Sequence, residues 1–203
     1  MPPRDSILKR WGISEEQLTE LVDSNPSLRG MMLGYVAESK FHDSFLEHPL
    51  ITEIAKDDDH DRSRKGDRRI LYRGTSLVIE VKSLQTAMVR KLGDDSWEGK
   101  AQVDGSDRRV ITFPDGSQLN TTLLLRGQFD ILAVNCFAFG ETWRFAFAKN
   151  EDLPTSTFRK YSELQRRQLI ASLVPVKWPP VPPFFEDPFP LLDDTVASKR
   201  TAS

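Results

Sequence analysis

The sequence has little cysteine and lacks long apolar runs. Cys136 is the single cysteine among 203 residues, so the chain cannot form an internal disulfide. Its position inside an apolar run favours a buried structural thiol over a nucleophile. No apolar run approaches the length needed to cross a bilayer, and Met1 to Asp5 lack the apolar core of a signal peptide. We therefore expect a soluble, cytoplasmic protein with no membrane partner.

An excess of charge of one sign is also missing. Lys and Arg number 28 and Asp and Glu number 30, for a net charge of -2, so binding to a polyanion requires local clustering of basic residues. The three histidines, His42, His48 and His60, lack the paired spacing of structural zinc sites. The acidic run 57–61 lacks the glycine and terminal glutamate of a calcium loop. The pattern argues against both kinds of site.

The length predicts a single domain over residues 1–174, including its N-terminal helices. Prolines 175, 179, 180, 182 and 183 exclude regular helix, so residues 175–203 are expected to form an extended or disordered proline-rich tail. Its Pro-Pro-Val-Pro-Pro segment suits either an aromatic groove of a partner or packing back on the domain.

Helix signals dominate the first part of the chain. Ser14 and Gln17 have capping-box spacing and predict a helix that ends at Asn25-Pro26. Asn25 or Ser27 then caps a second helix to about residue 46, which carries Glu38. Residues 57–69 are almost wholly charged and are expected to form a solvated loop.

Strand signals follow the charged loop. Segments 70–73 and 77–82 predict a hairpin with its turn at residues 74–76. Segment 109–113 predicts another strand, 118–126 fits either helix or strand, and 129–139 with 143–147 predict two strands joined by a tight turn. A last helix is expected from a cap at residues 155–157 to about Leu173.

The second hairpin strand carries the residues that suggest chemistry. Glu80 and Lys82 are two apart and project from one face, whereas Leu77, Ile79 and Val81 project from the other. A turn centred between residues 74 and 75 would place Asp67 opposite Lys82 and Arg69 opposite Glu80. In that register, Asp67 and Glu80 can share a cation.

These residue types suit hydrolysis of a phosphodiester. Carboxylates of Asp67 and Glu80, with the backbone carbonyl of Val81, are the hard oxygen ligands that Mg²⁺ prefers. The metal can lower the pKa of a bound water, while Lys82 orients or deprotonates the attacking water and stabilises charge on the phosphate.

The pattern Gly66-Asp67, twelve residues, then Glu80-Val81-Lys82 resembles the signature of the PD-(D/E)xK nuclease superfamily over about residues 28–148. Gly66 stands where the signature has proline. The resemblance implies an α/β fold: a restriction-endonuclease-like αβββαβ core whose central mixed sheet is flanked by helices, with an N-terminal helical extension. It also implies a role for Glu38 as the acid on the preceding helix, and for Gln85 near the metal or the scissile phosphate.

The function that the resemblance implies is that of a Mg²⁺-dependent DNA endonuclease in restriction, defence or DNA repair, with Mn²⁺ as a substitute metal. Duplex DNA is the expected substrate, with RNA left open, and a homodimer or an added specificity subunit is compatible with it. Basic residues near the motif, Lys65, Arg68 and Arg69 among them, are expected to contact backbone phosphates. Arg159, Lys160, Arg166 and Arg167 form either a second phosphate contact or a solvated helix face.

Two other interpretations compete with a nuclease. The first is a catalytically silent nuclease-fold module that binds nucleic acid or protein within a larger assembly. The second is an interaction protein whose charged strand face is ordinary surface. A second Glu-x-Lys triplet, Glu38-Ser39-Lys40, shows that the letters alone are weak, although its helical context separates its side chains.

Overall fold

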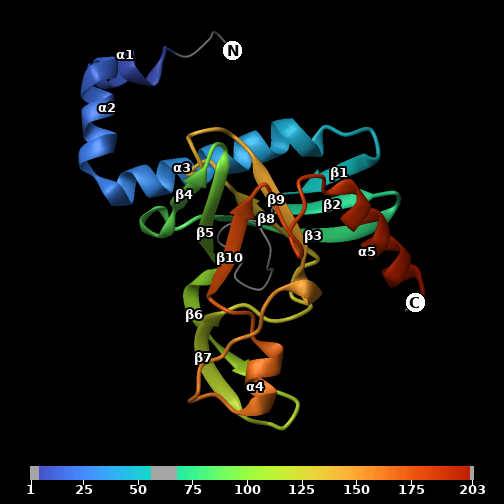
Figure 1. Cartoon of the computed structure of the whole chain (residues 1–203). Helices are drawn as coiled ribbons and strands as arrows, with labels where there is room; N and C mark the ends of the chain where they lie inside the picture. Colours follow the sequence, from blue (N-terminus) through green and yellow to red (C-terminus); the bar gives the residue numbers. More distant parts are fainter. Residues whose placement is uncertain (1–4, 56–67, 202–203) are drawn as a thin grey trace. The chain divides into compact units, whose positions relative to one another are not determined.

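The computed structural model describes residues 5–55 and 68–201, apart from the side chains of residues 53–55 and 106 (Figure 1). The chain divides into two compact units, Met1–Lys40 and Phe41–Ser203. The predicted boundary at residue 174 stays a prediction. Each unit is described by itself.

The first unit is helical. It contains α1 (Ile7–Trp11), α2 (Glu15–Ser24) and most of α3 (Pro26–Phe41). The predicted capping box is present: the amide of Gln17 donates to Ser14 Oγ at 3.2 Å, and the amide of Ser14 donates to Gln17 Oε1 at 2.9 Å. Pro26 begins α3, where its fixed φ and missing N–H are tolerated. Both predicted helices are confirmed.

The second unit begins with a π-helical turn, η1 (His42–Leu46). Helical structure therefore continues to residue 46, as predicted. Phe41, Phe45 and Leu46 belong to or pack against one hydrophobic cluster of the second unit, and the ring centroids of Phe45 and Phe147 lie 4.9 Å apart, nearly perpendicular. Burial of this aromatic group fixes the end of the helix on the sheet.

A five-stranded mixed sheet is the centre of the second unit. Its strands are β1 (Ile51–Ala55), β2 (Arg68–Tyr72), β3 (Thr75–Ser83), β8 (Ile131–Asn135) and β9 (Phe145–Lys149), in the order β1-β2-β3-β8-β9. β3 and β8 are parallel, and the other neighbours are antiparallel. The expected central mixed sheet is confirmed.

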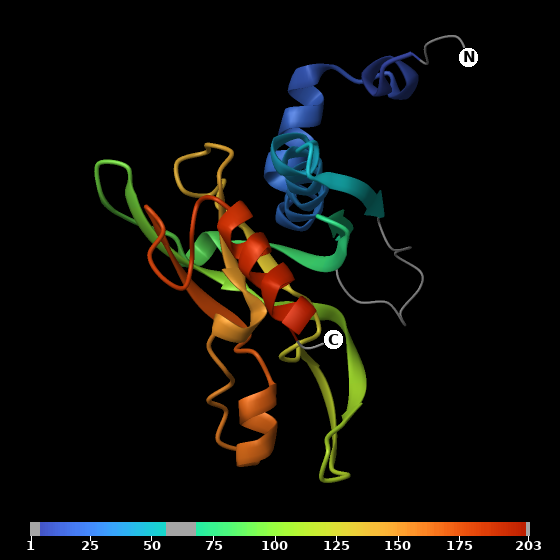
Figure 2. The same ribbon diagram turned by 90° about the vertical axis from the view of Figure 1, so that its right-hand side faces the viewer.

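Both faces of this sheet are covered. Alternate residues Leu77 and Ile79 of β3 face a cluster that includes Leu192 and Val196 of α5 (Phe189–Thr201), and Figure 2 shows α5 lying along the sheet. The opposite face packs against a second sheet, ordered β10-β5-β4. Its strands are β4 (Arg90–Gly93), β5 (Ser96–Gln102) and β10 (Leu173–Trp178).

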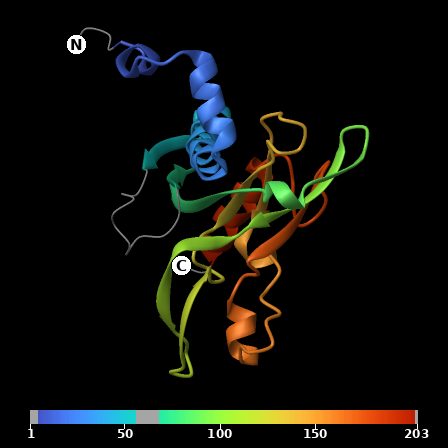
Figure 3. The same ribbon diagram turned by 90° about the vertical axis from the view of Figure 1, so that its left-hand side faces the viewer.

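A smaller lobe is built from the hairpin β6 (Asp104–Thr112) and β7 (Gln118–Leu123) together with α4 (Glu163–Gln168). Ile111, Phe113 and Leu169 form its apolar cluster, against which Leu164 of α4 packs. Figure 3 shows the hairpin and α4 extending from the same end of the sheets. The segment 118–126, whose sequence fits either state, is largely strand.

The turn of the β2–β3 hairpin lies one residue earlier than predicted. Arg73 and Gly74 both have positive φ, 47° and 76°, as a two-residue type I′ turn requires. Tyr72 therefore pairs with Thr75 and Arg69 with Val78. The prediction that Arg69 lies opposite Glu80 was wrong by two residues, and an even shift leaves every side chain on its expected face.

Other differences concern connections and the C-terminus. The chain between β3 and β8 holds strands β4 to β7 and the 3-10 turn η2 (Thr86–Met88), where the αβββαβ order places a helix. β8 and β9 are joined by a loop over residues 136–144, not a tight turn, and η3 (Asn150–Asp152) follows β9. Ser162 caps α4, which is shorter than predicted.

The proline-rich tail was expected to lack regular structure, and two elements occupy it. Pro175 lies in β10, a strand at the edge of its sheet, where a missing N–H is tolerated. Pro190 is the second residue of α5, where the first turn of a helix also tolerates proline. None of the described helices combines the length and apolar character that a membrane crossing requires.

Candidate active site

Glu80 and Lys82 come together on β3 as predicted. Lys82 Nζ lies 2.7 Å from Glu80 Oε1, and the side chains of Lys82 and Glu80 are 21% and 8% exposed, respectively. Leu77 and Ile79 are buried on the opposite face with partly buried Val81. The period of two along the strand thus separates a charged pair from an apolar face.

The surroundings of Glu80 are more apolar than a surface strand would provide. Parallel pairing places Glu80 beside Leu132 and Lys82 beside Val134, and both of these β8 residues are fully buried. Burying a carboxylate in such surroundings is expensive unless a cation compensates its charge. The ammonium of Lys82 provides that compensation.

Arg109 of β6 is a second cation near Glu80, and its place there is not evident from the sequence. Burial lowers the pKa of Arg109, and the negative charge of Glu80 acts in the opposite direction. Its Nη2 donates to the carbonyl of Leu123 at 2.9 Å and to Gln128 Oε1 at 2.8 Å. Because β6 lies far along the chain from β3, no local pattern pointed to this residue.

The residues predicted on the neighbouring strand are described only in part. Asp67 and Lys65 lie outside the described residues, so their predicted roles stay predictions. Arg68 and Arg69 begin β2 and are each half-buried, with Arg69 opposite Val78 and hence on the sheet face of Glu80.

Gln85 belongs to a polar chain that the sequence does not predict. Its side-chain amide donates to Gln102 Oε1, and Gln102 Nε2 donates to Asp104 Oδ2 at 3.1 Å. The backbone amide of Gln85 donates to the carbonyl of Lys100 at 2.8 Å. The three side chains line a hollow of about 330 Å³.

The roles predicted for Glu38, as an assisting acid, and for the carbonyl of Val81, as a metal ligand, stay predictions. Glu38 lies on α3 within the first unit, whereas Glu80 lies within the second. Val81 lies in β3 and is paired with Ala133 of β8.

Asp130 lies at the start of an apolar strand. By sequence alone it could be a second acid near the metal, a cap or a salt-bridge partner. Its Oδ2 accepts from the amide of Val78 at 2.7 Å, and its Oδ1 lies 2.8 Å from Lys199 Nζ of α5. These contacts tie the start of β8 to β3 and α5, which is a structural role.

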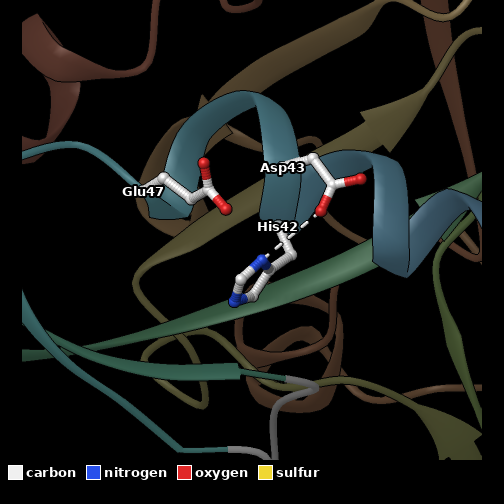
Figure 4. A group of neighbouring side chains, drawn as sticks. All are labelled: His42, Asp43 and Glu47. Atoms are coloured by element: carbon white, nitrogen blue, oxygen red, sulfur yellow. Dashed lines mark ion pairs between the residues drawn. The ribbon is translucent and has the colours of Figure 1, made fainter.

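A second group of potential ligands lies on the π-helical turn. Figure 4 shows His42, Asp43 and Glu47, whose ligand atoms all lie within 4.8 Å of one another. A π-helix has hydrogen bonds between residues five apart, so this turn brings Glu47 closer to His42 than an α-helix would. Within the described residues it is the one group of three such side chains. Both carboxylates are exposed, and His42 Nδ1 is 3.6 Å from Asp43 Oδ1.

The chain was compared with protein-family models, curated proteins and solved structures. No protein-family model matches the chain, and no curated protein matches it. Among solved structures, a bacterial homing endonuclease, I-Ssp6803I, matches with 17% sequence identity and a TM-score of 0.36, over 71% of this chain and 74% of that chain. Similarity of that size carries no argument about activity.

Proposed function

We propose that this chain is a metal-dependent DNA endonuclease whose active site is centred on Glu80 and Lys82. The observation that carries the proposal is their burial as a close pair on a central strand of the mixed sheet. A charged pair of ordinary surface alternation would be exposed, whereas Glu80 is buried and Lys82 is partly buried, and charged side chains are seldom buried in proteins.

The side chains present suit Mg²⁺. The buried carboxylate of Glu80 offers hard oxygen donors. Asp67 immediately precedes Arg68, which is opposite Ile79, the residue before Glu80. We propose Asp67 and Glu80 as ligands, with the carbonyl of Val81 and with Glu38 assisting. When bound, Mg²⁺ would supply a water of lowered pKa and would neutralise charge on the phosphate, and Mn²⁺ would substitute for it.

Lys82 is the residue proposed to act on the water. Its ammonium is already held near the carboxylate face by the 2.7 Å contact with Glu80, so little reorganisation is needed for it to contact a nearby phosphate oxygen. A lysine there orients the attacking water, and its charge stabilises the developing negative charge of the phosphate. Arg109, engaged by Leu123 and Gln128, is proposed to position the Glu80 carboxylate through the attraction between their opposite charges.

The same proposal extends to the biological role, the substrate and the oligomeric state. We infer a role in restriction, defence or DNA repair, with duplex DNA as substrate and Arg68, Arg69 and Lys65 as backbone contacts. A homodimer would allow each protomer to cut one strand, and a separate specificity subunit is an alternative way to choose the target. Gln85 is proposed to contact nucleic acid from the end of β3.

The test is a cleavage assay of the purified full chain on supercoiled and linear DNA with Mg²⁺, with EDTA alongside. Lys82→Ala is expected to abolish cutting and to leave DNA binding nearly unchanged. Lys177→Ala removes an exposed lysine of β10 and serves as the matched control that keeps activity. Cutting that survives Lys82→Ala would refute this active site, and DNA binding without cutting would favour the silent recognition module.

A further inference from the structure

Two neighbouring hollows lie on the second unit, one beside the residues that follow β3 and one beside the segment that precedes α4. The hollow lined by Gln85, Gln102 and Asp104 also contacts Ser172 and Leu173. Those last two residues line a second hollow, of about 540 Å³, together with residues 156–160 and 171. Because they share these residues, the two hollows are neighbours. We call the second hollow the Phe158 groove.

The Phe158 groove carries positive charge without compensation. Arg159 and Lys160 line it and are exposed. Within the part of the chain that the structure describes, neither has an ion-pair partner. The nearby acid on α4, Glu163, is paired with Arg167. A backbone phosphate would therefore meet two available cations here.

The other hollow has the opposite character. Asp104 lines it and accepts a hydrogen bond from Gln102. A carboxylate repels phosphate, so phosphates are placed at Arg159 and Lys160 and not beside Asp104.

Phe158 adds an exposed aromatic face beside these cations. The side chain is 51% exposed, and its ring centroid lies 5.0 Å from that of Tyr161 with an angle of 75° between the ring planes. The carbonyl of Tyr161 accepts from Arg166 Nη1 at 2.8 Å. The amide of Phe158 donates to Ser156 Oγ at 3.4 Å. These contacts hold the ring in place while much of it stays open to the groove.

We propose that the Phe158 groove binds a single-stranded segment of nucleic acid, with phosphates on Arg159 and Lys160 and a base stacked on Phe158. Cations that follow the backbone and an aromatic platform for bases are the usual elements of single-strand binding. The choice of ligand class rests on the proposed nuclease function. The bases of a duplex are already stacked and paired, so a duplex would contact the cations alone.

The hollow next to the Phe158 groove lies near the proposed active site. Gln85 lines that neighbouring hollow and lies three residues beyond Lys82, a distance of at most about 10 Å along extended chain. We infer that a strand held by the Phe158 groove extends past Gln85 toward β3. The substrate class that this arrangement suits is duplex DNA with an unpaired segment next to the cleaved bond.

The first measurement is fluorescence anisotropy of a labelled mixed-sequence single strand and its duplex, with the full chain in EDTA. Phe158→Leu keeps apolar volume and removes the stacking face, and is expected to weaken single-strand binding by about 5-fold to 150-fold. Phe158→Trp is expected to retain binding. Phe185→Leu is the matched control because Phe185 is 44% exposed and does not line the groove.

The second measurement is the salt dependence of single-strand binding. Replacing Arg159 and Lys160 together by alanine is expected to reduce the slope of log affinity against log salt by about 0.7 for each phosphate that is no longer neutralised. Replacing Arg10 and Lys177 by alanine removes two exposed cations that do not line the groove. That control variant should keep the slope.

Both binding assays are repeated in a Lys82→Ala background, and the cleavage assay described above reports cutting. Thermal unfolding confirms that each variant is folded. Binding that depends on Phe158 without any metal-dependent cutting would uphold the groove and overturn the nuclease. Cutting that depends on Lys82 with no effect of Phe158→Leu on single-strand affinity would do the reverse. Absence of single-strand binding, or an equal loss for single strand and duplex, overturns the groove.

Discussion

The carboxylate of Glu80 is buried, and its charge is compensated by Lys82, whose Nζ lies 2.7 Å from Glu80 Oε1. Removing one partner of such a pair leaves an uncompensated charge, which destabilises proteins by about 3 to 5 kcal/mol when the pair is fully buried. Lys82 keeps some contact with solvent, so we expect a smaller loss. Lys82→Met should lower the free energy of unfolding by about 1 to 3 kcal/mol.

Urea unfolding of a double-mutant cycle measures this coupling. Glu80→Gln combined with Lys82→Met removes both charges and should recover part of the stability lost in Lys82→Met alone. Additive losses would mean that the pair contributes no coupling energy, and the electrostatic account of the site would then be wrong.

Cys136 gives a prediction about pH. Burial raises the pKa of its thiol from 9.0 to about 12, so the native thiol stays protonated and unreactive at about pH 8. Reaction with a disulfide reagent should be slow in the folded chain and fast in denaturant. Equal rates in both states would show that Cys136 is accessible.

The same shift determines the sign of a stability change. The unfolded thiol ionises near its ordinary pKa while the folded thiol keeps its proton, so the contribution of Cys136 to stability is intact below about pH 9. It is then lost as the pH rises toward 12. Burial raises the pKa of Tyr72 as well, which acts in the same direction. Cys136→Ala should lessen the alkaline loss of stability in urea unfolding measured between about pH 8 and 11.

At the scale of elements, α5 shows how a segment expected to be a tail becomes structural. Leu192 is buried against the central sheet, and Lys199, 41% exposed, pairs with Asp130. We expect Leu192→Ala to lower the free energy of unfolding by about 2 to 5 kcal/mol, and Lys199→Ala by about 1 kcal/mol or less. The exposed Ser198→Ala is the control and should change it by less than about 0.5 kcal/mol. Chemical denaturation measures all three, and an unaffected Leu192→Ala would contradict the docking of α5.

The elements that the sequence could predict are those with local signals. Ser14 and Gln17 determine the start of α2 by hydrogen bonds within four residues. Alternation along β3 separates Glu80 from Leu77. The hairpin register was missed because Arg73 adopts a positive φ that a non-glycine residue seldom takes. The structure of the C-terminal segment was not predicted because the number of prolines does not show where each one lies. Pro175 lies at a sheet edge and Pro190 in a first helical turn, and both places tolerate proline.

At the scale of the whole chain, long-range pairing brings together residues that no local pattern connects. Arg109 reaches the neighbourhood of Glu80 only because β6 follows a second sheet that packs on the first. His42 and Glu47 meet only because the helix ends in a π-turn, since residues five apart in an α-helix point in different directions. Sequence therefore identified the charged strand and missed the partners that tertiary structure provides.

The two groups of potential metal ligands, one at Glu80 and one at His42, Asp43 and Glu47, lead to different expectations for how a metal stabilises the whole chain. A cation that binds only the folded state raises stability by mass action, by about 2.7 kcal/mol at a hundredfold excess over its Kd. Mg²⁺ prefers oxygen donors, so its stabilisation should depend on Glu80, whereas the imidazole of His42 suits transition metals better. In thermal unfolding with Mg²⁺, Glu80→Gln should remove the rise in melting temperature, and the control Glu47→Gln should keep it. If Glu47→Gln removed the rise and Glu80→Gln kept it, the metal would bind at the π-helical turn, and the charged pair of β3 would be structural.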